Sequence, residues 1–124
     1  MNRVIHFEIH AEDPQRAMDF YAEVFDWSFQ AFGGPLEYWT VVTGPDGQPG
    51  INGGLMRRQG PAPEEGQALI SWVGTIEVAS IDDSVAAAVA AGGRVVVPKM
   101  EIPGVGWSCS CKDPEGNVFG LFCA

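Results

Sequence analysis

Positive charge is scarce in this sequence. Seven Lys and Arg side chains stand against sixteen Asp and Glu side chains, so the formal net charge at pH 7 is −9. A protein of that charge repels nucleic acids and anionic membrane surfaces at long range. The local basic pair Arg57–Arg58 is interpreted as a solvated strand end. We therefore expect neither a nucleic acid nor a membrane as a partner.

Long hydrophobic runs are missing as well. Hydrophobic residues make up 46% of the chain. Gly, Pro or charged residues interrupt them before any run approaches the ~20 residues of a membrane span. At the N-terminus, Arg3, His6 and Glu8 break up what would be the apolar core of a signal peptide. We therefore expect a soluble, cytoplasmic protein.

Cysteine is also rare, with three residues in the chain. Cys109 and Cys111 lie two apart in a predicted strand, so their side chains point the same way and cannot readily form a disulfide with each other. Cys123 lies near the end of the chain. We expect reduced, buried thiols. At 124 residues the chain is long enough to bury the core of a single domain without disulfides.

The chemistry of the sequence is concentrated in its first twenty-odd residues. A strand predicted over Val4 to Ile9 is apolar on one face and carries His6, Glu8 and His10 on the other. Asp13 then predicts the N-cap of a helix of about three turns, with the following proline as its first residue. We expect this helix to pack on the apolar face of the strand.

The remaining elements repeat this order. A second helix is predicted between the N-cap Ser80 and Gly92–Gly93. Residues 59–67, rich in Pro, Gly and Glu, predict a linker. β-branched and aromatic composition predicts further strands at 37–43, 51–57, 71–78, 94–97 (ending before Pro98), 107–112 and 118–123.

A strand, a helix and further strands therefore occur in both halves of the chain, which predicts one module over about 1–58 and a second over about 68–124. Aligning the two helix starts sets Val73 against His6, Thr75 against Glu8 and Glu77 against His10; aligning the closing strands sets Gly54–Leu55 against Gly120–Leu121.

Two glycines, Gly53 and Gly54, fall inside a predicted strand. Glycine weakens a strand interior unless the strand bends or another group approaches closely. The sequence therefore predicts a close approach or a bend at this point.

Two motifs identify a resemblance. H-x-E-I-x-x-x-D-P-x-R-A-x-x-F-Y-x-x-V-F-x-W runs from His6 to Trp27, and D-P-E-G-N-V-x-G-L runs from Asp113 to Leu121. Together they resemble the vicinal oxygen chelate superfamily of glyoxalases, bleomycin-resistance proteins and extradiol dioxygenases. The resemblance implies a single α+β, glyoxalase-like domain over 1–124, with two βαβββ modules forming curved mixed sheets around a cavity. It also implies a homodimer.

Metal-using members of that superfamily place four ligands in the cavity, on the first and last strand of each module. By resemblance these positions fall on His6, Gly54, Val73 and Gly120. One ligand of four is left, whereas a divalent metal needs about three protein ligands. We expect no cofactor. A divalent metal held weakly by His6, Glu8 and His10, which would also need Glu77 as a ligand, stays open as the alternative.

The polar face of the first strand admits two further interpretations. Glu8 could orient His6 in a structural hydrogen-bond network. The same two side chains could instead act on a ligand as a general acid and base, and are the candidate catalytic residues.

Aromatic residues are frequent for a chain of this size and include four tryptophans. We expect a cavity lined by several of them to bind a flat organic molecule. The candidate ligand-binding residues are Trp39, Trp107, Trp72, Tyr38 and Phe119.

These observations favour a metal-free protein that binds a small aromatic or hydrophobic molecule between its modules. The alternative is an enzyme, a glyoxalase-like lyase or isomerase or a dioxygenase, that uses a metal or His6 and Glu8. A third possibility is a domain whose own side chains fill the cavity and whose function depends on its outer surface. Nothing in the sequence names the ligand.

Overall fold

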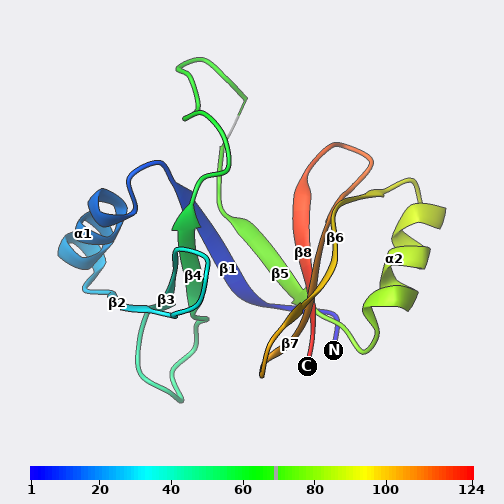
Figure 1. Cartoon of the computed structure of the whole chain (residues 1–124), viewed down its shortest axis with the longest axis horizontal. Helices are drawn as coiled ribbons and strands as arrows, with labels where there is room; N and C mark the ends of the chain where they lie inside the picture. The colour runs from blue at the N-terminus through cyan, green and yellow to red at the C-terminus, as the bar shows by residue number, and fades with distance from the viewer. Residues whose placement is uncertain (69) are drawn as a thin grey trace. The chain divides into compact units, whose positions relative to one another are not determined.

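The computed structural model describes residues 1–68 and 70–124. The chain divides into two compact units (Figure 1). We call His6–Trp72 module one, and Met1–Ile5 together with Val73–Ala124 module two. Residue 69, which the sequence assigns to the second module, lies outside the described residues. That the two modules form a single domain stays a prediction.

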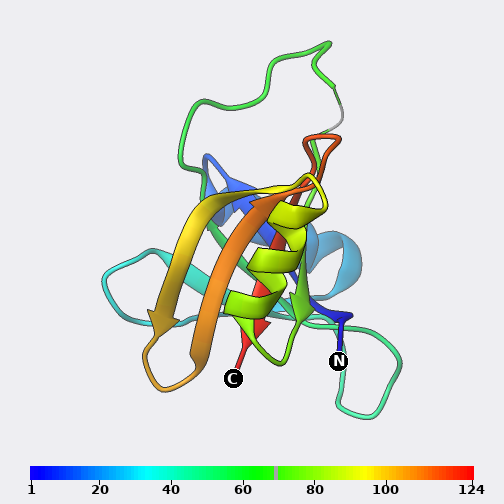
Figure 2. The same cartoon turned by 90° about the vertical axis from the view of Figure 1, so that its right-hand side faces the viewer.

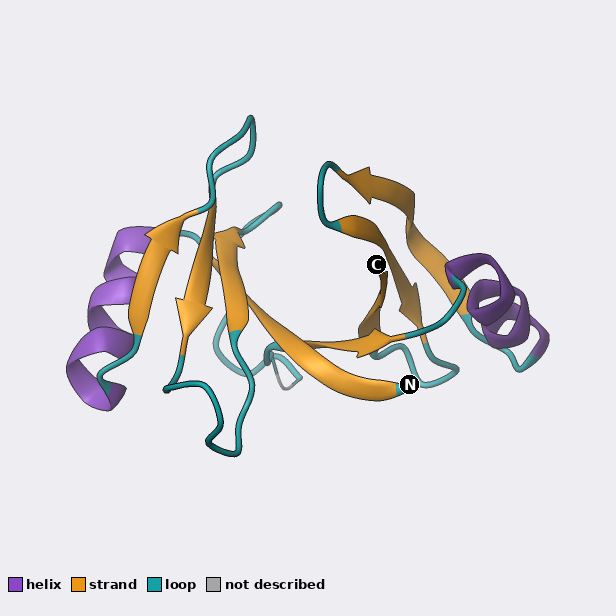
Figure 3. Cartoon of the chain, turned by 90° about the horizontal axis from the view of Figure 1, so that it is seen from below, coloured by secondary structure: helices purple, strands orange, loops and turns teal. Residues whose placement is uncertain are grey.

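Module one has four strands and one helix. Its strands follow the order β2-β3-β4-β1, in which β1 and β4 are parallel and the other neighbours antiparallel. Helix α1 lies on one side of these strands (Figure 3). The bounds are β1 Arg3–Ala11, whose first residues belong to module two, α1 Pro14–Phe25, β2 Ser28–Ala31, β3 Tyr38–Val42 and β4 Gly53–Arg57.

Module two repeats this arrangement. Its strands follow the order β5-β8-β7-β6, again with the first pair parallel and the others antiparallel. Helix α2 lies over them (Figure 2). The bounds are β5 Val73–Glu77, α2 Ile81–Ala90, β6 Arg94–Ile102, β7 Gly106–Lys112 and β8 Val118–Cys123. The predicted α+β class with two βαβββ modules of mixed strands is confirmed.

Both helices begin where the sequence predicts. The Asp13 side chain accepts a hydrogen bond from the Arg16 backbone N–H at 3.1 Å, and the Ser80 hydroxyl oxygen accepts one from the Asp83 N–H at 3.1 Å. These bonds satisfy backbone donors that a helix start otherwise leaves without partners. Among the described residues, no helix has the length and apolarity needed to cross a membrane.

Two strands differ from the sequence-based expectation. β2 forms at Ser28–Ala31, where aromatic residues stand among turn formers, because β3 pairs with it along its whole length. β6 continues through Pro98 to Ile102 instead of ending at Val97. The strand lies at the end of the strand order and its pairing with β7 is irregular between Val97 and Met100. Proline is tolerated in an edge strand at such an irregularity.

Each module has its own apolar core between helix and strands. The buried core residues of module one are Phe7, Ile9, Met18, Val41 and Leu55. Those of module two are Val78, Ile81, Cys109, Cys111 and Leu121. The three thiols are free, and Cys109 and Cys111 are buried as the sequence predicts.

Candidate functional site

The site is built on the pairing of each first strand with its closing strand. Glu8 pairs with Gly54 in the parallel β1–β4 ladder, and Thr75 pairs with Gly120 in the parallel β5–β8 ladder. Glu8 and Thr75 therefore hold equivalent positions in their own modules, as do the two glycines. This register agrees with the alignment of the two modules made from the sequence.

The two glycines of β4 are explained by close approach. A Cβ atom on Gly53 would come within 2.5 Å of the Phe7 carbonyl oxygen and 2.7 Å of its ring, and one on Gly54 would overlap the hydroxyl group and ring of Tyr38. The sequence predicted a close approach or a bend here, and the structure shows the approach. The Tyr38 hydroxyl therefore occupies the space that a side chain at position 54 would enter.

Tyr38 is the centre of a hydrogen-bonded chain across module one. Its hydroxyl donates to Glu8 Oε2 at 3.3 Å and lies 3.1 Å from His6 Nε2. Because the hydroxyl proton is directed to the carboxylate, the hydroxyl oxygen can accept a hydrogen bond from His6 in the neutral tautomer that carries its proton on Nε2. His10 Nε2 donates to Glu8 Oε1 at 3.0 Å. The chain therefore runs His6, Tyr38, Glu8, His10.

This arrangement corrects one detail of the predicted network. Glu8 was expected to orient His6, but their nearest nitrogen and oxygen atoms are 4.0 Å apart. The hydroxyl of Tyr38 bonds to both and links them indirectly. The side chains of His6, Glu8 and His10 are 32%, 28% and 37% exposed, so a ligand can reach all three.

Burial shifts the pKa of two of these groups. Desolvation lowers the pKa of His6 below its usual 6.5, although the negative charge of Glu8 acts in the opposite direction. Burial, followed by the charge of Glu8 and the hydrogen bond to it, raises the pKa of Tyr38 well above its usual 10. At neutral pH the face therefore presents a neutral imidazole and a neutral phenol.

The residues present do not fit the metal of the superfamily. Of the four ligand positions that the resemblance implies, His6 alone carries a donor, and the space beside Gly54 is taken by a phenol that stays protonated. Within residues 1–68 and 70–124, no group of three or more His, Cys, Asp or Glu side chains could hold a metal ion. That the protein works without a metal stays a prediction.

The aromatic candidates of module one are not gathered around this face. Side chains alternate along a strand, so Trp39 lies on the opposite face of β3 from Tyr38. Trp39 packs against the core of module one, and Trp72 stacks on Phe7 with ring centroids 5.1 Å apart. Tyr38 is thus the one aromatic candidate of this module that contacts His6 and Glu8.

The aromatic candidates of module two lie near opposite ends of the β7–β8 ladder. Trp107 pairs with Cys123 and Phe119 with Cys111. Phe119 packs against the core of its module, whereas the Lys99 ammonium lies 4.9 Å from the centre of the Trp107 ring.

Sequence reasoning listed Tyr38 for its aromatic ring and missed the role of its hydroxyl. The available signal was Gly54, because an interior strand glycine indicates that something approaches. The letters do not say which side chain fills the space. That information comes from the register of β3, which sets Tyr38 opposite Met56, two pairs beyond Gly54 and on the same face.

A family model described as "Glyoxalase-like domain" matches residues 6–122. The chain therefore belongs to this family, which confirms the resemblance drawn from the two motifs. No curated protein matches the sequence.

Solved structures share the fold at low sequence identity. A hypothetical protein, BH1468, from Bacillus halodurans C-125 has a TM-score of 0.70 at 10% identity, covering 99% of this chain and 94% of that one. Methylmalonyl-CoA epimerase from Mycobacterium tuberculosis gives 0.66 at 13% identity, with 97% and 86% covered. A glyoxalase/bleomycin resistance protein/dioxygenase superfamily member from Vibrio splendidus 12B01 gives 0.63 at 14% identity, with 100% of both chains covered.

Proposed function

We propose that the protein binds a small organic molecule at the polar face formed by His6, Tyr38 and Glu8, without using a metal. The observation that supports this most strongly is the Tyr38 hydroxyl, which lies where a ligand side chain at position 54 would be and bonds to both neighbours. A position where the resemblance implies a metal ligand is thus occupied by part of a hydrogen-bonding surface.

The surroundings of Tyr38 favour a molecule with an aromatic or hydrophobic part. Phe32 meets the Tyr38 ring edge-on, with centroids 5.8 Å apart, and the residue is 51% exposed. Met56 pairs with both His10 and Tyr38 and is half-buried. An aromatic group can pack on this apolar border while a polar group meets the imidazole, phenol and carboxylate.

The second candidate function is an enzyme of the same superfamily, a lyase or isomerase that uses His6 and Glu8 as acid and base. The lowered pKa of His6 favours it, because an imidazole that is neutral at pH 7 can accept a proton. A dioxygenase would need a metal site that the donor set does not supply.

The test begins with protein purified without chelator, measured for metal content and screened by thermal shift against aromatic metabolites and antibiotics. A ligand that binds the folded state raises the melting temperature. We expect substoichiometric metal and at least one ligand whose affinity falls on His6→Ala and on Tyr38→Phe but not on Glu23→Gln, a control on the exposed side of α1.

Two results would contradict the proposal. Near-stoichiometric Ni, Zn, Fe or Mn would restore the metal-dependent alternative. Ligands whose affinity is the same in all four proteins would place binding elsewhere. Turnover of a bound ligand, lost in His6→Ala, would favour the enzyme. Homodimer formation and a cytoplasmic location remain predictions; sedimentation measures the first and cell fractionation the second.

A further inference from the structure

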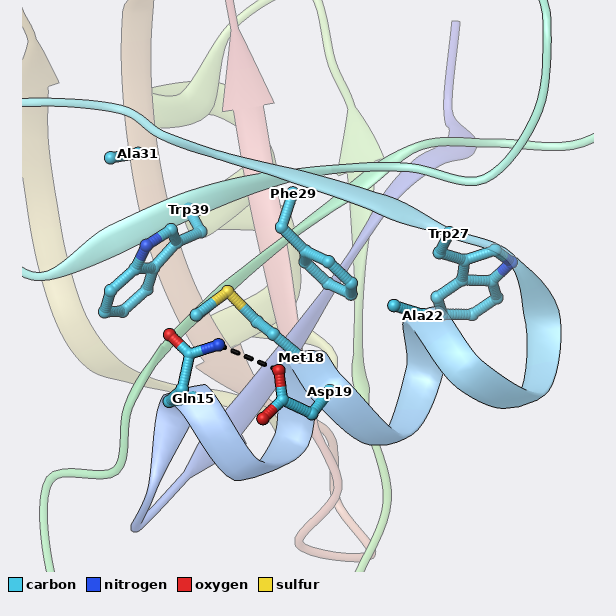
Figure 4. Close-up of a pocket in the computed structure, with 8 residues that line it drawn as sticks. All are labelled: Gln15, Met18, Asp19, Ala22, Trp27, Phe29, Ala31 and Trp39. Atoms are coloured by element: carbon cyan, nitrogen blue, oxygen red, sulfur yellow. Dashed lines mark hydrogen bonds between the residues drawn. The ribbon is translucent and has the colours of Figure 1, made fainter.

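Module one has a second candidate binding site on its helix side. An open hollow of about 330 Å³ lies between α1 and the strands β2 and β3 (Figure 4). Trp39 lines it, so it lies on the face of β3 opposite to the one that carries Tyr38. The lining residues are Gln15, Met18, Asp19, Ala22, Trp27, Phe29, Ala31 and Trp39.

The hollow follows from small residues at two places. On α1, Gln15, Met18, Asp19 and Ala22 recur at helical spacing and form one face. Ala22 ends this face with a single methyl group. On the sheet side, Ala31 pairs directly with Trp39, so no large side chain covers the neighbouring indole. Larger side chains at these two alanines would fill the space.

The walls combine aromatic rings with one negative charge. Trp27, Phe29 and Trp39 are half-buried. The Asp19 carboxylate lies at the rim, where Oδ1 accepts a hydrogen bond from Gln15 Nε2 at 2.9 Å. Within the described part of the chain, Oδ2 has no hydrogen-bond partner. No Lys, Arg or His lines the hollow, and the whole chain carries a net charge of −9.

We propose that this hollow binds a small organic cation, an ammonium ion that carries an aromatic or other apolar group. A cation is attracted both to the faces of aromatic rings and to a carboxylate, and the apolar group gains from contact with Met18 and the indoles. The volume is at the lower end of the range of small-molecule sites. The site is separate from the polar face of His6, Tyr38 and Glu8, and the proposal does not depend on the function proposed for that face.

The probe pair is benzyltrimethylammonium and phenylmethanesulfonate, which share a benzyl group and differ in charge. Each is titrated into the full-length protein and followed by two-dimensional amide NMR. We expect saturable shifts with the cation, centred on residues of α1, β2 and β3 that line the hollow. With the anion we expect at least tenfold weaker binding.

Two variants and one control test the site itself. Asp19→Asn removes the charge while its side-chain oxygen can still accept from Gln15, and is expected to weaken the cation about threefold, as for an exposed ion pair. Glu23→Gln removes a charge one helical turn away, outside the hollow, and is expected to leave the affinity unchanged. Ala31→Leu, checked for folding by its NMR spectrum, should abolish saturation by filling the space beside Trp39.

The proposal is overturned if both probes bind equally, because contact would then be merely apolar. It is overturned equally by shifts centred on His6 and Glu8, by equal losses in Asp19→Asn and Glu23→Gln, or by no saturation with the cation.

Discussion

Module one and module two carry a glycine at the same place on their closing strands and cover it in different ways. Gly54 is covered by Tyr38, which reaches over from β3. In module two the residue at the place of Tyr38 is Ser108, which likewise lies two pairs beyond the glycine but is too short to reach it. There the nearest group is the Thr75 hydroxyl on β5, 2.8 Å from where a Cβ on Gly120 would lie.

This difference separates position from chemistry. The register of the strands is the same in both modules, so the repeat fixes where the glycine and its neighbours lie. The side chains determine which chemistry each of these positions can support. In module one they form a chain of two imidazoles, a phenol and a carboxylate. In module two, Thr75 and Ser108 carry hydroxyl groups at the places of Glu8 and Tyr38, and Glu77 stands at the place of His10.

The largest effect is expected from adding a methyl group to each glycine. Gly54→Ala should force Tyr38 away and break its bonds to His6 and Glu8, at a cost of about 2–3 kcal/mol of unfolding free energy, in the range of overpacked sites. Gly120→Ala should cost about 1 kcal/mol, because Thr75 can rotate its hydroxyl away. Denaturant unfolding measures both.

A double-mutant cycle tests the cause. In a Tyr38→Ala background most of the cost of Gly54→Ala should disappear, because the colliding side chain is gone. Gly53→Ala is the matched control: its clash is with the Phe7 backbone oxygen, which Tyr38→Ala does not relieve. Equal costs of Gly54→Ala and Gly120→Ala would show that the two modules cover their glycines alike. An unchanged cost of Gly54→Ala in the Tyr38→Ala background would show that Tyr38 is not the side chain with which it collides.

The sequence predicted the elements that the two modules share. Local sequence patterns were enough to predict the helix caps at Asp13 and Ser80 and the order of the elements. Aligning the two predicted helix starts was then enough to place Glu8 and Thr75 at equivalent positions. The alternation along β1 likewise placed His6, Glu8 and His10 on one face.

The hydroxyl at the centre of the site was not predictable. Alternation says that Tyr38 and Trp39 point to opposite faces but not which of them joins His6, since either aromatic ring can face a core. The outcome depends on how β3 pairs with β4, a contact between segments far apart in the chain. Pro98 illustrates the same point, because its tolerance depends on β6 lying at the end of the strand order.

The next effect concerns the Tyr38 hydroxyl alone. Tyr38→Phe keeps the ring over Gly54 and removes the bond donated to Glu8 and the partner of His6, so we expect a loss of about 1 kcal/mol in unfolding free energy. Chemical denaturation gives the value. The phenol should also resist ionisation: in an alkaline titration followed by tyrosine absorbance, Tyr38 should stay protonated until the wild type unfolds. An unchanged stability in Tyr38→Phe would mean that the chain of hydrogen bonds adds nothing.

A smaller effect is expected from pH. The pKa of His6 is lower in the folded protein than its unfolded value of 6.5, so the unfolded state takes up the proton first as pH falls. The stabilisation is present above pH 6.5 and is lost as pH falls toward the folded pKa. Since 32% of the side chain is exposed, solvent screens part of the effect. The measurement is unfolding free energy between pH 8 and pH 5, where His6→Gln should give a flatter dependence than wild type. His10→Gln is the matched histidine control, and identical slopes in wild type and His6→Gln would contradict the assignment.

The smallest effect should come from Thr75→Val, the counterpart in module two of removing the Tyr38 hydroxyl. The Thr75 hydroxyl makes no side-chain hydrogen bond within the described residues, and valine has nearly the same shape, so the unfolding free energy should change by no more than about 0.5 kcal/mol. Denaturation of this variant beside Tyr38→Phe compares the two hydroxyls directly. A loss of 1 kcal/mol or more would mean that the Thr75 hydroxyl makes a stabilising hydrogen bond, as the Tyr38 hydroxyl does. The chemical difference between the modules would then lie in the ionisable groups of β1 rather than in the residue that covers the glycine.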